Sequence, residues 1–198
     1  MSKRKKNQKE IEVKVILIGE AGVGKTNLIN VSTGMKFDEK TKPTISSTFV
    51  RNEFTIDSYN YIVNLWDTAG QEKLKSLTKL FYKGSDIVIY VYDITSKQTF
   101  ESLQTWVEET DSILENKHTS GIVGNKKDLY VHEQVSEEEA KKYADSQNMK
   151  FKLVSAKDDP KSFITFIEEL LRDSKSFLFE KNNISLENTN KKKHKCNC

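Results

Sequence analysis

The sequence predicts an α/β protein whose six-stranded, mostly parallel sheet has one antiparallel edge strand and helices on both faces. Three observations support this fold class. Apolar runs alternate with segments of helical spacing, which is typical of parallel strands joined by right-handed crossovers. The run Ile87–Tyr92 is continuously apolar, as in a strand buried on both faces. The runs Phe49–Ile56 and Tyr61–Trp66 are separated only by the polar turn DSYN, which favours an antiparallel hairpin.

The remaining elements follow along the chain. Ile122 and Val123 are the apolar part of a short, weakly signalled strand, and Ser136 with Glu139 indicates a capping box at the start of a helix. Further strands are expected over Val13–Ile18 and Phe151–Val154, and helices over Thr99–Leu114, Ser136–Gln147 and Lys161–Leu171.

Length and composition indicate one ordinary globular domain. The chain has 198 residues, of which 36% are hydrophobic, and it lacks the run of about 20 apolar residues that spans a bilayer. We expect a flexible basic arm over residues 1–11, the folded domain over 12–173 and a flexible tail over 174–198. The basic start has no apolar segment of a secretory signal, and both cysteines lie among the last three residues, so we expect a cytosolic protein without disulfides.

The positive charge is concentrated at the end of the chain. The net charge is +3, but the last eight residues, KKKHKCNC, hold four lysines. The other residues carry 28 basic and 29 acidic side chains, a balance that argues against a nucleic-acid-binding domain.

The stretch GEAGVGKT, Gly19 to Thr26, follows one apolar run and precedes a helical segment. Its spacing is that of a phosphate-binding loop, in which backbone N–H groups and a helix N-terminus hold phosphates. Lys25 would reach the phosphate oxygens, and the Thr26 hydroxyl would ligate Mg²⁺. The alternative is a glycine-rich turn without a ligand.

A second motif, WDTAGQEKL, begins at the end of an apolar strand, where parallel sheets place their ligand chemistry. Asp67 would hold Mg²⁺ through water, the Gly70 N–H would bond a terminal phosphate, and Gln71 would orient an attacking water. On its own, Asp-x-x-Gly is commonly just a turn.

The stretch NKKD, Asn125 to Asp128, suggests the identity of the base. A carboxylate such as Asp128 accepts hydrogen bonds from N1–H and the exocyclic amine of guanine, which adenine cannot supply. Asn125 and Lys126 would tie this loop to the phosphate loop and cover the base, and Ser155 opens SAK, which would offer a backbone N–H. Alone, NKKD is a common solvated turn.

In this order, GEAGVGKT, WDTAGQE, NKKD and SAK resemble the motifs of the Ras-like small GTPases, and most of all the Rab branch. The resemblance runs from about Val13 to Arg172. It implies the P-loop NTPase fold, GTP and GDP binding with Mg²⁺, slow hydrolysis, and two switch segments that respond to the γ-phosphate.

The resemblance also implies a set of site residues. The catalytic residues would be Gln71, Lys25 and Thr44, and the metal ligands Thr26, Thr44 and Asp67. Phe37 would stack on guanine, and Phe49, Trp66 and Phe81 would form the effector surface, although core packing is an alternative for Phe49 and Trp66. The nucleotide-binding residues would be Glu20, Ala21, Gly22, Val23, Gly24, Lys25, Thr26, Asn27, Phe37, Thr44, Gly70, Asn125, Lys126, Asp128, Leu129, Ser155, Ala156 and Lys157.

Five positions depart from the family pattern. Ser46, Ser47 and Thr48 replace residues typical of Rab proteins after the switch I threonine, and Thr41 stands where many relatives carry tyrosine. Ala21 occupies a position that is glycine in the Ras branch. Its methyl group would crowd Gln71 or an incoming arginine, so we expect slower hydrolysis than in glycine-bearing relatives.

The terminal Cys196-x-Cys198 matches the Rab pattern in which both thiols receive geranylgeranyl groups. Two lipid chains next to lysines would anchor the protein to an anionic membrane. The alternatives are a metal clip formed by His194, Cys196 and Cys198, and a nuclear or nucleic-acid role for the lysine run.

These inferences describe a monomeric switch on the cytoplasmic face of an intracellular membrane, with a cytosolic pool. Its partners would be an exchange factor, a GTPase-activating protein, effectors, and the chaperones of prenylation and membrane extraction. The alternative function is a guanine-nucleotide-binding scaffold with little or no turnover. A metabolic kinase or transport ATPase is disfavoured because NKKD and SAK select guanine.

Overall fold

One six-stranded sheet organises the molecule, with its strands in the order β2-β3-β1-β4-β5-β6. The computed structural model describes residues 9–41, 44, 48–57, 59–67, 81–114 and 117–182. The strands are β1 (Lys9–Ile18), β2 (Thr48–Ile56), β3 (Tyr59–Asp67), β4 (Ile87–Asp93), β5 (Thr119–Asn125) and β6 (Lys150–Leu153). Only β2 and β3 pair antiparallel, and every other neighbouring pair is parallel. The predicted fold class is therefore confirmed.

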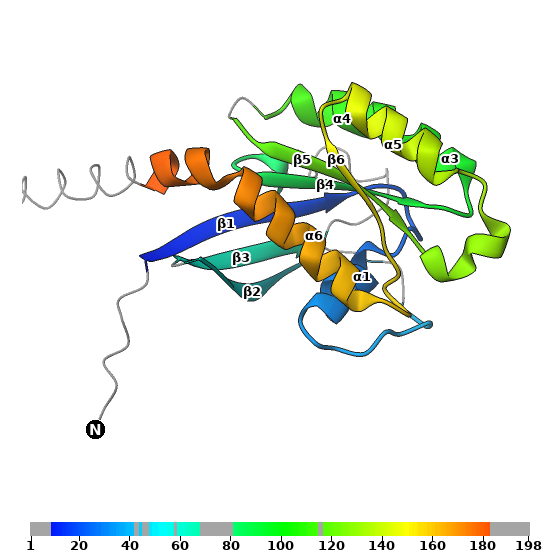
Figure 1. Ribbon diagram of the computed structural model, residues 1–198, viewed down its shortest axis with the longest axis horizontal. Coiled ribbons are helices and arrows are strands. Elements are labelled where there is room, and N and C mark those ends of the chain that lie inside the picture. Colours follow the sequence, from blue (N-terminus) through cyan, green and yellow to red (C-terminus); the bar gives the residue numbers. More distant parts are fainter. Residues whose placement is uncertain are drawn as a thin grey trace, which may run out of the picture.

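Helices cover both faces of the sheet (Figure 1). The helical elements are α1 (Lys25–Ser32), α3 (Lys97–Glu101), α4 (Leu103–Asp111), the 3₁₀ helix η2 (Lys127–His132), α5 (Glu137–Ser146) and α6 (Pro160–Asp173). Helices α1 and α6 pack on one face, and α3, α4 and α5 on the other. Alternation along β1 supplies both cores, because Val15 and Leu17 join the first apolar cluster while Ile16 and Ile18 join the second.

Strand β5 is longer than its sequence suggested. Two of its residues are glycines, which give no apolar signal and have low strand propensity. A Cβ on Gly121 would lie 2.7 Å from Phe166 Cζ, and one on Gly124 would lie 2.6 Å from Leu153 Cδ2. The glycines therefore let neighbouring side chains, including those of α6, pack directly against the strand.

The helix expected over Thr99–Leu114 is divided into α3 and α4 at Ser102. The Ser102 hydroxyl donates a 2.9 Å hydrogen bond to the Gln98 carbonyl, the kind of back-bonding that competes with regular helix geometry. The capping box at Ser136 is half formed: the Ser136 hydroxyl accepts from the Glu139 N–H, but the Glu139 carboxylate pairs with Lys97.

Ordered packing continues past the boundary expected at residue 173. Residues 175–182 are helical, Leu178 is fully buried and Phe177 nearly so. The Phe179 ring meets Tyr59 edge-on, with their centroids 4.5 Å apart. These apolar side chains give the segment a contact with the core, so the folded part of the chain extends beyond the expected boundary.

Among the described residues, none of the helices is both long enough and apolar enough to cross a bilayer. Cys196 and Cys198, to which lipids were assigned, lie outside the described part of the chain.

Candidate functional site

A cavity of about 440 Å³ lies at the carboxyl end of the parallel strands, where β1 and β5 deliver their loops. Of the residues predicted to bind nucleotide, it brings fourteen together, and it adds Glu39 and Thr41, which were not in that set. Its lining residues are Ala21, Gly22, Gly24, Lys25, Thr26, Asn27, Phe37, Glu39, Thr41, Thr44, Asn125, Lys126, Asp128, Leu129, Ala156 and Lys157. Glu20, Val23 and Ser155 are not among them.

The loop after β1 requires glycine for two separate reasons. Gly22 and Gly24 have φ values of 81° and 97°, a region that disfavours side chains. A Cβ on Gly24 would also lie only 2.4 Å from the Asn125 side-chain nitrogen. Helix α1 begins directly after this turn, at Lys25, so its first N–H groups face the cavity, as in an anion site.

Lys25 brings a buried positive charge to this loop. Lys25 as a whole is only 5% exposed. Its ammonium group donates hydrogen bonds to the carbonyls of Gly19 (2.7 Å) and Glu20 (2.8 Å). Burial lowers the pKa of Lys25 to about 8, while the carboxylates of Asp67 and Glu20 act in the opposite direction. An anion bound in the cavity would stabilise the charged ammonium group and so offset the hydration that the group loses on burial.

Three oxygen-bearing side chains meet beside Lys25. The Thr26 hydroxyl lies 2.8 Å from that of Thr44, and these hydroxyls donate to Asp67 Oδ2 over 2.7 and 3.1 Å. Asp67 Oδ1 is buried and has no hydrogen-bond partner among the residues that the structure describes, and burial raises the pKa of this carboxyl. An unpartnered buried oxygen beside two hydroxyls fits a hard cation such as Mg²⁺. Within the described ranges no group of three or more His, Cys, Asp or Glu side chains is placed to hold a metal ion. Thr26, Thr44 and Asp67, the predicted metal ligands, do meet at one point.

Asn125 fastens three loops at the other end of the cavity. It is 2% exposed; its Nδ2 donates to the Val23 carbonyl over 2.8 Å, and its Oδ1 accepts from the Ala156 N–H at 3.3 Å. The loops after β1, β5 and β6 are thereby joined through one side chain. The predicted tie between NKKD and the phosphate loop is therefore present at Asn125. The Ala156 N–H, a candidate donor to the base, is engaged by Asn125.

Asp128 is oriented by a residue whose side chain had no predicted role. The Ser155 hydroxyl donates a 2.6 Å hydrogen bond to Asp128 Oδ1, and it also accepts from the Asp158 N–H. This arrangement fixes the carboxylate against the cavity. The only signal in the sequence was a hydroxyl residue at the end of a strand, which is too common to be informative.

Lys126 and Glu20 make contacts that the sequence did not indicate. The Lys126 ammonium pairs with Asp93 Oδ2 at 2.6 Å, so its side chain ties NKKD to the end of β4, although the residue also lines the cavity. The indole N–H of Trp106 donates to Glu20 Oε1 over 3.2 Å. Trp106 on α4 therefore holds the phosphate loop in place through the side chain of Glu20.

The three aromatic residues predicted as an effector surface are neighbours. Phe49 stacks on Trp66 with centroids 5.1 Å apart, and Trp66 lies 5.9 Å from Phe81. Phe49 is 56% exposed, which rules out core packing as its role, whereas Trp66 is partly buried against an apolar cluster. The Lys14 ammonium lies 4.9 Å from the centre of the Trp66 ring and donates to the Phe81 and Lys83 carbonyls.

Several predicted residues lie outside the described part of the chain. They are Gly70 and Gln71 of the second motif, Ser46 and Ser47 of the segment after Thr44, and the two cysteines.

Comparison with known proteins agrees with this geometry. The model of the Ras family matches residues 14–175. Ras-related protein Rab-21 of Geodia cydonium is 38% identical over 153 residues, covering 77% of this chain and 67% of that protein. Ras-related protein RabC of Dictyostelium discoideum is 38% identical over 156 residues, which cover 77% of this chain and 79% of that protein. Ras-related protein Rab-7a of Paramecium octaurelia is 36% identical over 172 residues, which cover 84% of this chain and 81% of that protein. The chain therefore belongs to the Ras family of small GTPases and, within it, most resembles the Rab proteins.

Proposed function

We propose that this chain is a Rab-like switch in membrane trafficking, which binds GTP and GDP with Mg²⁺ and hydrolyses GTP slowly. One observation carries the proposal. A single cavity joins the buried Lys25 ammonium, the hydroxyl of Thr44 and the oriented carboxylate of Asp128. Lys25 is suited to the phosphates of a nucleotide and Asp128 to its guanine base. Thr44 is suited to sensing the γ-phosphate as part of the switch segment.

The residues divide the work along the cavity. Lys25 and the N–H groups of the loop hold the β- and γ-phosphates, and Asp128 accepts from the guanine N1–H and amine, with Ser155 keeping the carboxylate in place. Thr26, Thr44 and Asp67 would hold Mg²⁺, which, when bound, neutralises charge that develops on the phosphates. Because Thr44 belongs to the segment after α1, loss of the γ-phosphate frees that segment.

Hydrolysis is assigned to Gln71, which would orient the attacking water. Ala21 lines the cavity and is exposed. Its methyl group would crowd this glutamine or an arginine from an activating protein, which would slow hydrolysis. The same methyl group favours a second candidate function, a nucleotide-holding scaffold with little turnover. Single-turnover hydrolysis of GTP by wild type and Ala21→Gly separates the two. A faster Ala21→Gly protein supports slowing by the methyl group, equal measurable rates dismiss it, and no turnover in either protein supports the scaffold.

The tail would anchor the switch through geranylgeranyl groups on Cys196 and Cys198. Lys9 at the start of β1 pairs with Tyr59, whose ring also contacts Phe179, so both ends of the folded part meet there. This end of β1 is the one away from the phosphate loop (Figure 1). A tail leaving there would keep the cavity and the aromatic surface open to exchange factors, activating proteins and effectors.

The membrane arm of the proposal has its own test. A tagged protein in which both cysteines are replaced by serine should move from membranes to the soluble fraction, because two lipid chains provide most of the anchoring. Unchanged membrane association would refute lipidation at these cysteines.

The nucleotide carried by gently purified recombinant protein tests the switch itself. We expect GDP, identified by chromatography after denaturation. Asp128→Asn should lose most of its preference for guanine, whereas Asp158→Asn, which changes a neighbouring carboxylate outside the cavity lining, should carry GDP like wild type. Bound ATP, or no nucleotide despite Mg²⁺, would contradict the proposal.

A further inference from the structure

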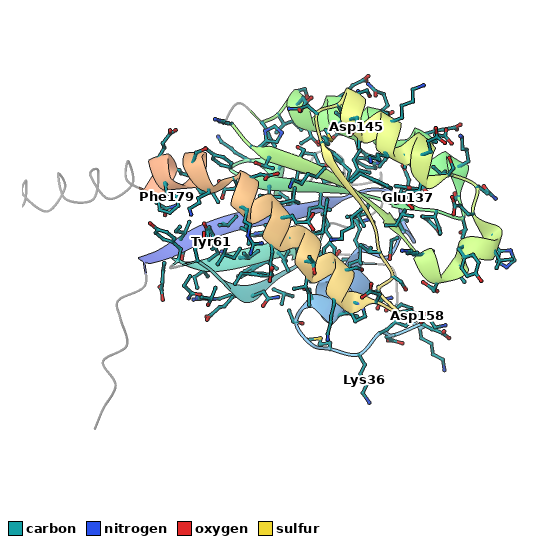
Figure 2. The ribbon with its side chains drawn as sticks, in the orientation of Figure 1. Lys36, Tyr61, Glu137, Asp145, Asp158 and Phe179 are labelled. Atoms are coloured by element: carbon teal, nitrogen blue, oxygen red, sulfur yellow. The ribbon has the colours of Figure 1, made fainter. Side chains whose placement is uncertain are left out.

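An ion pair crosses the mouth of the cavity. Glu39 Oε1 lies 2.7 Å from Lys157 Nζ, although the two residues belong to different loops and both line the cavity. Glu39 follows α1, and Lys157 precedes α6. Lys36 of the first loop and Asp158 of the second lie toward the same end of the molecule (Figure 2). The pair therefore joins the loop after α1 to the loop before α6 at the cavity.

Local hydrogen bonds present Glu39 to its partner. The Lys40 N–H donates to Asp38 Oδ1 over 2.8 Å, and the Thr41 hydroxyl donates to the Asp38 carbonyl over 2.7 Å. The Asp38 side chain bonding two residues ahead is an Asx-turn, which holds this stretch without any help from the ligand. Glu39 is thus carried on a preformed turn.

Asn27 fastens the other side of that turn to α1. Its Nδ2 donates to the Asp38 carbonyl over 3.0 Å, and its Oδ1 accepts from the Thr41 hydroxyl over 3.2 Å and from the Asp38 N–H over 3.3 Å. The predicted nucleotide-binding residue Asn27 therefore has a second role, as the inner anchor of the turn. The Glu39–Lys157 pair attaches the same turn to the loop before α6.

The charges around Lys157 suit a reversible contact. The Lys157 and Glu39 side chains are 47% and 70% exposed, so water can replace each partner when the pair opens. The hydrogen bond and charge of Glu39 raise the pKa of Lys157, so this ammonium group keeps its charge at physiological pH.

We propose that Glu39 and Lys157 form a latch across the cavity mouth that slows nucleotide release. The proposal rests on the proposed function, since the occupant is taken to be a guanine nucleotide. The ligand lies between the two loops, and these must separate before it leaves. The pair must break during that separation and so adds to the barrier for release, while the turn held by Asn27 closes again with Glu39 already in position.

Release of fluorescently labelled GDP into excess unlabelled GDP measures the latch directly. Glu39→Gln keeps the size of the side chain but removes its charge. We expect release about two- to fivefold faster, the range that an exposed ion pair can supply. The difference should shrink between about 0.01 M and about 1 M ionic strength, where the screening length falls from about 30 to about 3 Å.

Lys157→Met provides the matched background, because it keeps most of the aliphatic stem over the cavity and removes the ammonium. In that protein Glu39→Gln should no longer change the release rate. Glu53→Gln is the control, since Glu53 is a similarly exposed carboxylate paired with Arg51 at 3.7 Å on β2. It should release GDP at the wild-type rate.

The outcomes separate the two proposals. If wild type does not bind labelled GDP, the proposed function fails. If it binds and Glu39→Gln releases at the wild-type rate, the latch is wrong. An acceleration that persists in the Lys157→Met protein and at high salt also overturns it, because the effect would then not come from the pair.

Discussion

Replacing Asn125 by alanine tests whether one buried amide holds the cavity together. The change removes the hydrogen bonds to the Val23 carbonyl and from the Ala156 N–H, and leaves both backbone groups without this partner. Each buried polar group left unpaired costs about 1–3 kcal/mol, so for the two groups we expect the free energy of unfolding to fall by about 2–6 kcal/mol. Because the two groups belong to two different loops that Asn125 joins beside the cavity, the GDP dissociation constant should rise at least tenfold, or about 1.4 kcal/mol.

Urea unfolding at one saturating GDP concentration gives the sum of the two losses, provided that the slope with denaturant is unchanged. Titration with labelled GDP gives the second loss, and the first follows by difference. Asn52→Ala is the control, because Asn52 donates a 2.8 Å hydrogen bond to the Ser32 carbonyl and does not line the cavity. It should lose about 1 kcal/mol of stability and keep its GDP affinity. If Asn125→Ala loses less than about 1 kcal/mol and binds GDP like wild type, the fastening role assigned to Asn125 is wrong.

Three further predictions concern separate parts of the molecule. Gly24→Ala should weaken GDP binding far more than Gly34→Ala. Both glycines have positive φ, but only at Gly24 does a Cβ meet another residue within 4 Å; equal losses would mean that backbone strain alone matters. Leu178→Ala should lower the free energy of urea unfolding by about 2–5 kcal/mol, whereas the exposed Glu180→Ala should change it by under about 0.5 kcal/mol, and a neutral Leu178→Ala would refute core packing of residues 175–182. Lys14→Met should lower the free energy of unfolding by roughly 1–3 kcal/mol. It should also shift the fluorescence emission of Trp66, measured in a Trp106→Phe protein so that Trp66 is the sole tryptophan; an unchanged spectrum would argue against the cation–π contact.

The sequence predicted the fold because its signals agreed with one another. The apolar run of β4 and the two-strand hairpin each have a single structural interpretation. Agreement failed where side chains gave no local signal. Glycines hid the length of β5, and Ser102 divided a helix whose apolar spacing is continuous. The segment 175–182 falls in the predicted tail because its three consecutive apolar residues, Phe177, Leu178 and Phe179, show no helical spacing and lie among polar residues.

For the candidate site, motif residues were predictable and their supports were not. Lys25, Thr26 and Asp67 follow fixed spacings, and the structure gathers them with Thr44 around one buried oxygen. The Ser155–Asp128 bond and the Trp106–Glu20 bond join segments far apart in the chain. Such contacts depend on how loops meet in space, which no local pattern encodes.

The central claim is that Thr44 converts the presence of the γ-phosphate into the shape of its loop. Hydrogen exchange of the peptide that contains Thr44 tests it most directly, with GDP and with a non-hydrolysable GTP analogue compared in the presence of Mg²⁺. The account predicts clearly slower exchange with the triphosphate, because Thr44 then gains a ligand that it lacks with GDP. The same exchange rate with both nucleotides would contradict it.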